Sequence, residues 1–234
     1  MQVCGRDHKS FGCFPKTTSR LSSRVLDVSN NWLRLHVSKP GERGEYVALS
    51  HCWGALSQAQ KRAFCTSSAN LEPRCTQGLD FKTLPKTFQD AITVTRELGK
   101  GYLWIDAISI IQYDDDLEDW KKESGRMGNI FGNAYVTIAA KSARDATQGF
   151  FERPRLRDPN SQYAKVHTST HGTIYISGIL DDYHSDVKNG VLNQRPWVLQ
   201  ERALSRRTIH FTANQTHWEC GGGGRCETLT LMRK

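Results

Sequence analysis

The chain has 234 residues, of which 38% are hydrophobic, 24% charged and 9% aromatic. This composition excludes an intrinsically disordered chain and predicts one large domain, or one domain with a small appendage. The formal net charge is +8, but the basic residues do not gather into an arm, so nucleic-acid binding is not expected. No run reaches the ~20 apolar residues of a membrane helix, and no signal-peptide core is visible, so we expect a soluble, cytoplasmic protein without a membrane segment.

Seven cysteines, an odd number with irregular spacing, indicate thiols rather than a framework of disulfides. Three residues near the C-terminus, His217, Cys220 and Cys226, are of the types that bind zinc. No Cys-x-x-Cys pair occurs, however, and four glycines separate the two cysteines of this set. We therefore predict neither a metal site nor a cofactor.

The first elements in chain order are predicted strands. Alternating apolar and polar residues predict two short strands over 24–28 and 32–37, joined by a turn. The nearly continuous apolar run over 46–50 predicts a strand covered on both faces. Residues 55–82 are polar without a clear period, which predicts a long surface loop.

Helical periodicity follows over 84–98, with Thr83 as the expected cap and Gly99 as the expected stop. Apolar runs over 102–106 and 135–140 predict two more buried strands, and a helix from about residue 117 is expected between them. This alternation of strands and helices predicts an α/β core, a parallel sheet with crossover helices.

The last third of the chain has a different pattern. It predicts a hairpin around a turn at 169–172, a short helix over 197–204, and two strands over 208–211 and 216–219. We therefore expect a C-terminal portion with antiparallel strands. The predicted organisation is a polar segment 1–23, one domain 24–227 with its core at 24–150 and its C-terminal portion at 151–227, and a tail 228–234.

Polar motifs are predicted at the points where buried strands end. Ser50-His51-Cys52-Trp53-Gly54 follows the strand over 46–50, Asp106 closes the next strand, and a third motif spans 195–201. In open parallel sheets, binding sites lie at the carboxyl ends of the strands, where the loops converge. These three motifs are therefore the first places to look for a functional site.

The same motifs carry a resemblance to a known family. Blocks in one order along the chain are similar to those of the fungal heterokaryon incompatibility (HET) domain: Tyr46–Gly54, Leu84–Ile92, Leu98–Asp106, Arg195–Glu201 and Trp218–Cys220. The resemblance covers roughly residues 24–150 and 193–227. This chain has Ser109 where the family usually has a cysteine, so a nucleophilic thiol is not available at that position.

The resemblance implies a role in non-self recognition that triggers programmed cell death. The family has been likened to TIR domains, which share a flavodoxin-like parallel sheet and in some members cleave NAD; this implies a TIR-like core with NAD as a substrate. Such chemistry needs a carboxylate near the ribose, an aromatic wall and donors for the pyrophosphate. The candidate catalytic residues are Asp106 and Glu123, and the candidate substrate-binding residues are Ser50, His51, Trp53, Trp104, Arg195 and Glu201.

Each candidate also has a structural interpretation. Asp106 can cap a turn, Glu123 can be an exposed helix acid, and Glu201 can pair with a nearby arginine. The two tryptophans and His51 can belong to the core, and the adjacent His51 and Cys52 seldom face each other as a catalytic pair would. Two hypotheses remain open: an enzyme acting on NAD, or a signalling module that recruits other incompatibility proteins or further copies of itself.

Overall fold

The structure is a computed structural model. It describes residues 4, 13, 18–113, 117–152, 163–170, 172–177, 183–188, 191–194, 196–227 and 231–232. None of the helices in this part of the chain combines the length and the hydropathy that a membrane-spanning segment requires. The predicted domain limits of 24–227 stay a prediction.

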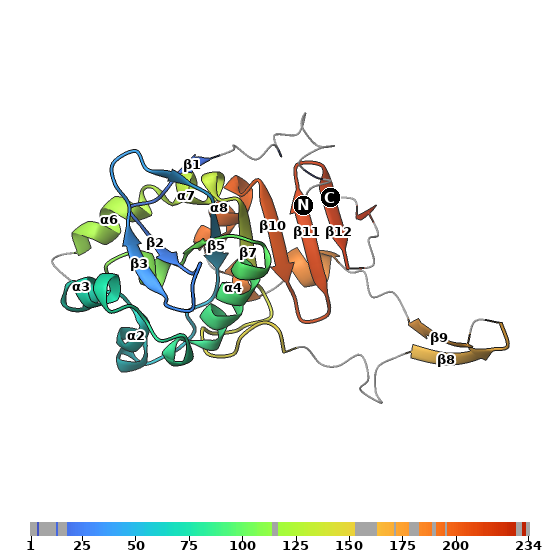
Figure 1. Ribbon diagram of the computed structural model, residues 1–234. Helices are drawn as coiled ribbons and strands as arrows, with labels where there is room; N and C mark the ends of the chain where they lie inside the picture. Colours follow the sequence, from blue (N-terminus) through green and yellow to red (C-terminus); the bar gives the residue numbers. More distant parts are fainter. Residues whose placement is uncertain are drawn as a thin grey trace.

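A nine-stranded mixed sheet organises the described residues, in the order β13-β12-β11-β10-β7-β5-β6-β2-β3 (Figure 1). Its four central strands are parallel: β6 (Tyr102–Trp104), β5 (Tyr46–Ser50), β7 (Val136–Ala140) and β10 (Arg207–Phe211). Antiparallel strands extend both sides: β2 (Arg24–Asp27) and β3 (Arg34–Val37) on one, β11 (Thr216–Cys220), β12 (Gly223–Cys226) and β13 (Leu231–Met232) on the other. The predicted parallel core is confirmed, and the C-terminal portion adds a fourth parallel strand to it.

Helices cover both faces of the central strands. They are α4 (Lys86–Glu97), α7 (Met127–Asn133) and α8 (Pro196–Leu204). Because side chains alternate along a strand, Val47 and Leu49 pack on the α4 side, whereas Tyr46 and Ala48 pack on the α7 side. Helix α8 lies beside α7, so the α7 face is shared by two helices. Burial on both faces explains the continuous apolar run of β5.

The prediction of a long surface loop over 55–82 is wrong. The structure has two helices there, α2 (Gln58–Phe64) and α3 (Ser68–Thr76), and a 3₁₀ turn, η2 (Phe81–Thr83). Capping boxes begin both helices: Ser57 with Gln60, and Ser67 with Asn70. These capping boxes supply hydrogen-bond acceptors to backbone N–H groups at the start of each helix, which would otherwise lack a partner within the helix. The helices are therefore set by their caps rather than by a broad apolar face.

Three other boundaries differ from the sequence prediction. Helix α4 begins at Lys86, and Thr83 instead bonds the carbonyl of Asp80 within η2. Strand β6 ends at Trp104, and a short helix α5 (Asp106–Ser109) follows at once. The helix expected from about 117 is two helices, α6 (Glu118–Ser124) and α7, with a break at 125–126.

Smaller elements complete the described chain. Strands β1 (Ser19–Arg20) and β4 (Arg43–Gly44) form one antiparallel pair, and β8 (Tyr163–Thr168) and β9 (Gly172–Ser177) form another. The second pair confirms the predicted hairpin. Two short helical turns, η4 (His184–Lys188) and η5 (Val191–Gln194), precede α8. Helix α8 itself confirms the helix predicted over 197–204.

Candidate functional site

The order of the parallel strands marks one place in the sheet. In the chain they follow one another as β5, β6, β7 and β10, but in the sheet they lie as β6-β5-β7-β10. The direction of connection therefore reverses between β5 and β7. In open α/β sheets, ligands bind outside the carboxyl ends of the strands at such a switch point. Here those ends present Ser50 from β5 and Lys141 just after β7.

A buried carboxylate lies at this point. The hydroxyl of Ser50 donates a hydrogen bond to Glu201 Oε2, and both residues are almost fully buried. Val198 lies one turn earlier on α8 and packs against Ala139 of β7, so it fixes the helix on the sheet. Residues three apart share a helix face, and Glu201 is therefore directed at the same surface.

A charged network lies beside this pair. Glu219 of β11 accepts hydrogen bonds from Arg202 at 2.9 and 3.1 Å, and its Oε2 lies 2.8 Å from His210 Nε2. Arg202 also donates to the Tyr183 hydroxyl at 2.9 Å. Lys141 donates to Asn193 Oδ1 at 2.6 Å. Side chains from β10, β11, α8 and the residue just after β7 thus lie on one face of the sheet.

Burial and neighbouring charges shift the pKa values of this network. Burial, with a smaller contribution from Arg202, lowers the pKa of Lys141 to about 8. Burial also lowers the pKa of His210 to about 4 and outweighs the hydrogen bond to Glu219. For Glu219, burial opposes ionisation, but hydrogen bonds from His210 and Arg202 outweigh it and hold the pKa well below its usual range. At neutral pH, Glu219 is therefore a carboxylate and His210 a neutral imidazole.

A small cavity separates these groups. Its volume is about 10 Å³, which is room for roughly one water molecule. Its lining combines polar and apolar side chains: Ser50, Thr137, Lys141, Arg202, Thr208 and His210 with Ala139, Leu192 and Val198. We call this set, with Glu201 and Glu219, the switch-point site.

Asp106 lies in a second cluster, on the α4 side of the sheet. The Trp53 indole donates to Asp106 Oδ2 at 2.9 Å, and the Ala107 backbone N–H donates to Oδ1 at 2.7 Å. His51 Nδ1 lies 3.8 Å from the same carboxylate, and its ring packs edge-on against Phe88. Three predicted residues, His51, Trp53 and Asp106, are therefore together. Their contacts hold the loop after β5 against α5, which fits the structural interpretation of Asp106; a catalytic role for it stays a prediction.

Glu123 is placed elsewhere. It is buried, not exposed, and its Oε1 accepts from Ser23 Oγ at 2.7 Å and faces Arg126 at 3.4 Å. It lines a broad groove together with Tyr46, on the α7 side of the sheet. The contacts that the described residues make do not join Glu123 to Asp106, so the two predicted catalytic carboxylates do not form a pair.

The remaining candidates are core residues, lie outside the described part of the chain, or do not converge. Trp104 is buried against Phe131, with ring centroids 5.6 Å apart. Arg195 lies outside the described residues. The three residues considered as zinc ligands in the sequence, His217, Cys220 and Cys226, do not converge. His217 pairs with Cys226 across the hairpin, whereas Cys220 lies three residues further along β11 and points to the opposite face of the sheet.

Comparison with known proteins identifies the family. Residues 46–201 match the model of the heterokaryon incompatibility protein (HET) family. The chain belongs to the HET family. A role in heterokaryon incompatibility follows at the level of that family. No curated protein and no solved structure matches the chain, so a TIR-like or flavodoxin-like core stays a prediction.

Several residues of the HET switch-point site were missed in the sequence. They are Lys141, Arg202, His210 and Glu219. Lys141 directly follows a predicted strand, so the rule that placed Ser50 at a carboxyl end also applies to it. His210 and Glu219 lie beyond the matched range, on paired strands whose register brings them to the same face. Nothing in the local sequence signals that pairing.

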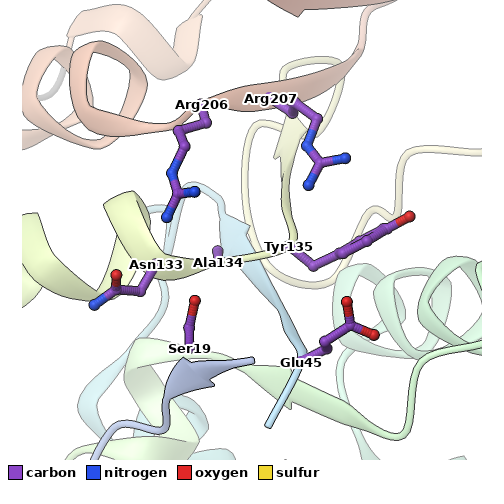
Figure 2. A pocket seen from close by; sticks show the side chains of 7 residues that line it. All are labelled: Ser19, Glu45, Asn133, Ala134, Tyr135, Arg206 and Arg207. Carbon is purple, nitrogen blue, oxygen red and sulfur yellow. The ribbon is translucent and has the colours of Figure 1, made fainter. Parts of the chain in front are cut away.

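A second pocket lies at the opposite, amino-terminal ends of β7 and β10 (Figure 2). In this view Arg207 lies above Tyr135, and Arg206 lies above Asn133 and Ala134. The Arg207 guanidinium lies 4.5 Å and the Lys100 ammonium 3.9 Å from the centre of the Tyr135 ring. Lys100 also pairs with Glu45 at 2.8 Å, and Arg206 donates to the Gly132 carbonyl at 2.8 Å. Because these cations already contact other groups of the protein, they are less available to a ligand. The switch-point site is therefore the stronger candidate for a functional site.

Because the pKa of His210 is lowered in the folded state, the free energy of unfolding of this HET domain depends on pH. An unfolded histidine binds its proton near pH 6.5, whereas folded His210 does so only near pH 4. The unfolded chain thus binds more protons between these values, and the free energy of unfolding decreases as pH falls from about 6.5 towards 4. Urea unfolding at pH 7 and pH 5 measures the loss. His210→Asn should lose less over this interval; an equal loss in both proteins would contradict the prediction.

Proposed function

We propose that the switch-point site of this HET domain hydrolyses the N-glycosidic bond of NAD or a related nucleotide in the cytoplasm, and that this reaction triggers programmed cell death. The supporting observation is the buried carboxylate of Glu201, which accepts a hydrogen bond from Ser50 at the switch point; Ser50 in turn lines the same cavity as Lys141 and His210. A buried carboxylate beside polar donors is what stabilisation of a ribose oxocarbenium ion requires.

The chemistry assigns roles to the residues of the site. Water adds to the ribose C1′ as the C–N bond breaks, giving ADP-ribose, nicotinamide and one proton. Glu201 steadies the positive charge that develops on the ribose, and Ser50 fixes the orientation of the carboxylate. Lys141 and Arg202 supply positive charge for the pyrophosphate. Because the cavity has room for roughly one water, a nucleotide enters only when η5 moves away from β7, a movement that leaves the Ser50–Glu201 hydrogen bond in place.

Turnover of NAD tests the proposal directly. The purified chain is incubated with NAD, and release of nicotinamide is followed by chromatography, with the protein both dilute and concentrated enough to associate. We expect nicotinamide and ADP-ribose in equal amounts. No release at high protein concentration, with the chain monomeric or associated, would overturn the proposal for this substrate.

A second candidate function rests on the outer surface of α8. Leu199 is 76% exposed and Leu204 44% exposed, and a groove of mixed polarity runs beside them between α8 and the end of β11. In this alternative, the domain kills by recruiting other incompatibility or signalling proteins, or a second copy of itself, without catalysis. Leu199→Ser would then abolish killing in a fungal host although NAD turnover, if present, is unchanged.

A further inference from the structure

Three cysteines from opposite ends of the chain meet on the α4 side of the sheet. Cys4 and Cys13 belong to the N-terminal segment, and Cys220 is the last residue of β11. All three are buried, and their sulfur atoms lie within 4.8 Å of one another. Trp218, on the same face of β11, packs against them. Among the described residues, this is the one group of three or more potential metal ligands that converges so closely.

The spacing of the sulfur atoms suits a metal ion. Zn–S bonds of about 2.3 Å in a tetrahedral site put neighbouring sulfurs roughly 3.8 Å apart. Sulfur atoms within 4.8 Å of one another reach that spacing by small shifts of side chains. All seven cysteines, each of which the structure describes, are outside disulfides. A disulfide would use only two of the three sulfurs, whereas a soft cation uses all of them.

We propose that Cys4, Cys13 and Cys220 bind one Zn²⁺ ion, or another soft divalent cation, through three thiolates. The fourth position of the tetrahedron is taken by a nitrogen or oxygen ligand such as water. Such a site fastens the N-terminal segment to the C-terminal hairpin of the sheet. It is separate from the switch-point site, which lies on the other face of β11.

Binding also has a proton balance. Burial, followed by the neighbouring thiols of Cys220 and Cys13, raises the pKa of Cys4 to about 12, so its thiol holds its proton when no cation is bound. One divalent cation displaces three protons and leaves the site with a net charge of −1. Arg225 pairs with Trp218 in the register of the hairpin, which puts its positive charge on the same face.

The experiment uses the full chain, purified under reducing conditions and loaded with Co²⁺ or Zn²⁺. We expect about one metal ion per chain, and charge-transfer and visible bands typical of tetrahedral Co²⁺ bound to thiolates. X-ray absorption of the Zn²⁺ form should show three sulfur ligands and one nitrogen or oxygen. A chelator should lower the melting temperature, because metal that binds only the folded state stabilises it.

Variants separate this site from other thiols. Cys220→Ser and Cys4→Ser should each bind less than about a tenth of the metal bound by the parent chain. Cys226→Ser is the matched control: Cys226 is equally buried and lies on the next strand of the same hairpin, but faces the other side. If Cys220→Ser does not fold, Cys4→Ser answers the question, since it leaves every strand intact. Failure of the parent chain to bind either metal, or equal loss in Cys226→Ser, would overturn the proposal.

Discussion

Replacing Glu201 with glutamine lowers the rate of nicotinamide release by about 100-fold or more, if the switch-point site works as proposed. The amide keeps the size of the side chain and can still accept a hydrogen bond from Ser50, so the fold is expected to persist. What is lost is the negative charge beside the ribose. Initial rates of NAD turnover measure the effect, with circular dichroism to confirm that the variant is folded.

Three further variants make the result specific. Glu97→Gln, at the exposed end of α4, should leave turnover unchanged. Glu123→Gln and Asp106→Asn test the two carboxylates predicted from the sequence. A folded Glu201→Gln chain that retains full activity, together with an inactive Glu123→Gln or Asp106→Asn chain, would move the reaction away from α8. If every variant kills a fungal host as well as the parent does, these carboxylates are structural.

The positions of the polar motifs were predictable because a local rule governs them. A continuous apolar run predicts a buried strand, and the residues that follow the run lie at the carboxyl end of that strand. Ser50, His51 and Asp106 were found in this way. The same rule does not tell on which face of the sheet a side chain emerges. Ser50 and His51 are neighbours in sequence but belong to the α8 and α4 faces respectively, and so to different clusters.

The partners of these motifs were not predictable, because they depend on contacts between distant segments. Glu201 meets Ser50 only because α8 returns to the sheet beside α7. Glu219 meets His210 through the register of β10 with β11. Cys4 and Cys13 meet Cys220 from the other end of the chain. In each case, the local sequence around one residue does not predict which distant residue it contacts.

The charged network can be tested through its central residue. Glu219→Gln should lower the free energy of unfolding by about 3 kcal/mol, because it removes the anion that Arg202 and His210 share in a largely buried setting. For a chain of this size, this corresponds to a melting temperature roughly 6–12 °C lower. Thermal unfolding at pH 7, checked for reversibility, provides the measurement.

Glu42→Gln is the matched control for this change. Glu42 also lies 2.8 Å from a histidine Nε2, that of His36, but these two side chains are 26% and 31% exposed, so solvent screens the pair more than it screens Glu219 and His210. Only a small shift in melting temperature is expected for it. Equal shifts in the two variants would show that burial adds nothing to the Glu219 contacts.

The pH dependence distinguishes the network from simple packing. The pKa of folded Glu219 lies below the value of about 4.5 in the unfolded chain, so its contribution is present above that pH and is lost as the pH falls further. Glu219→Gln should therefore lose less stability than the parent on acidification below about 4.5. The charge of Glu219 also raises the pKa of Lys141, so the amine should lose its proton at a lower pH in the variant. A stability loss that is the same at every pH would instead assign Glu219 a packing role alone.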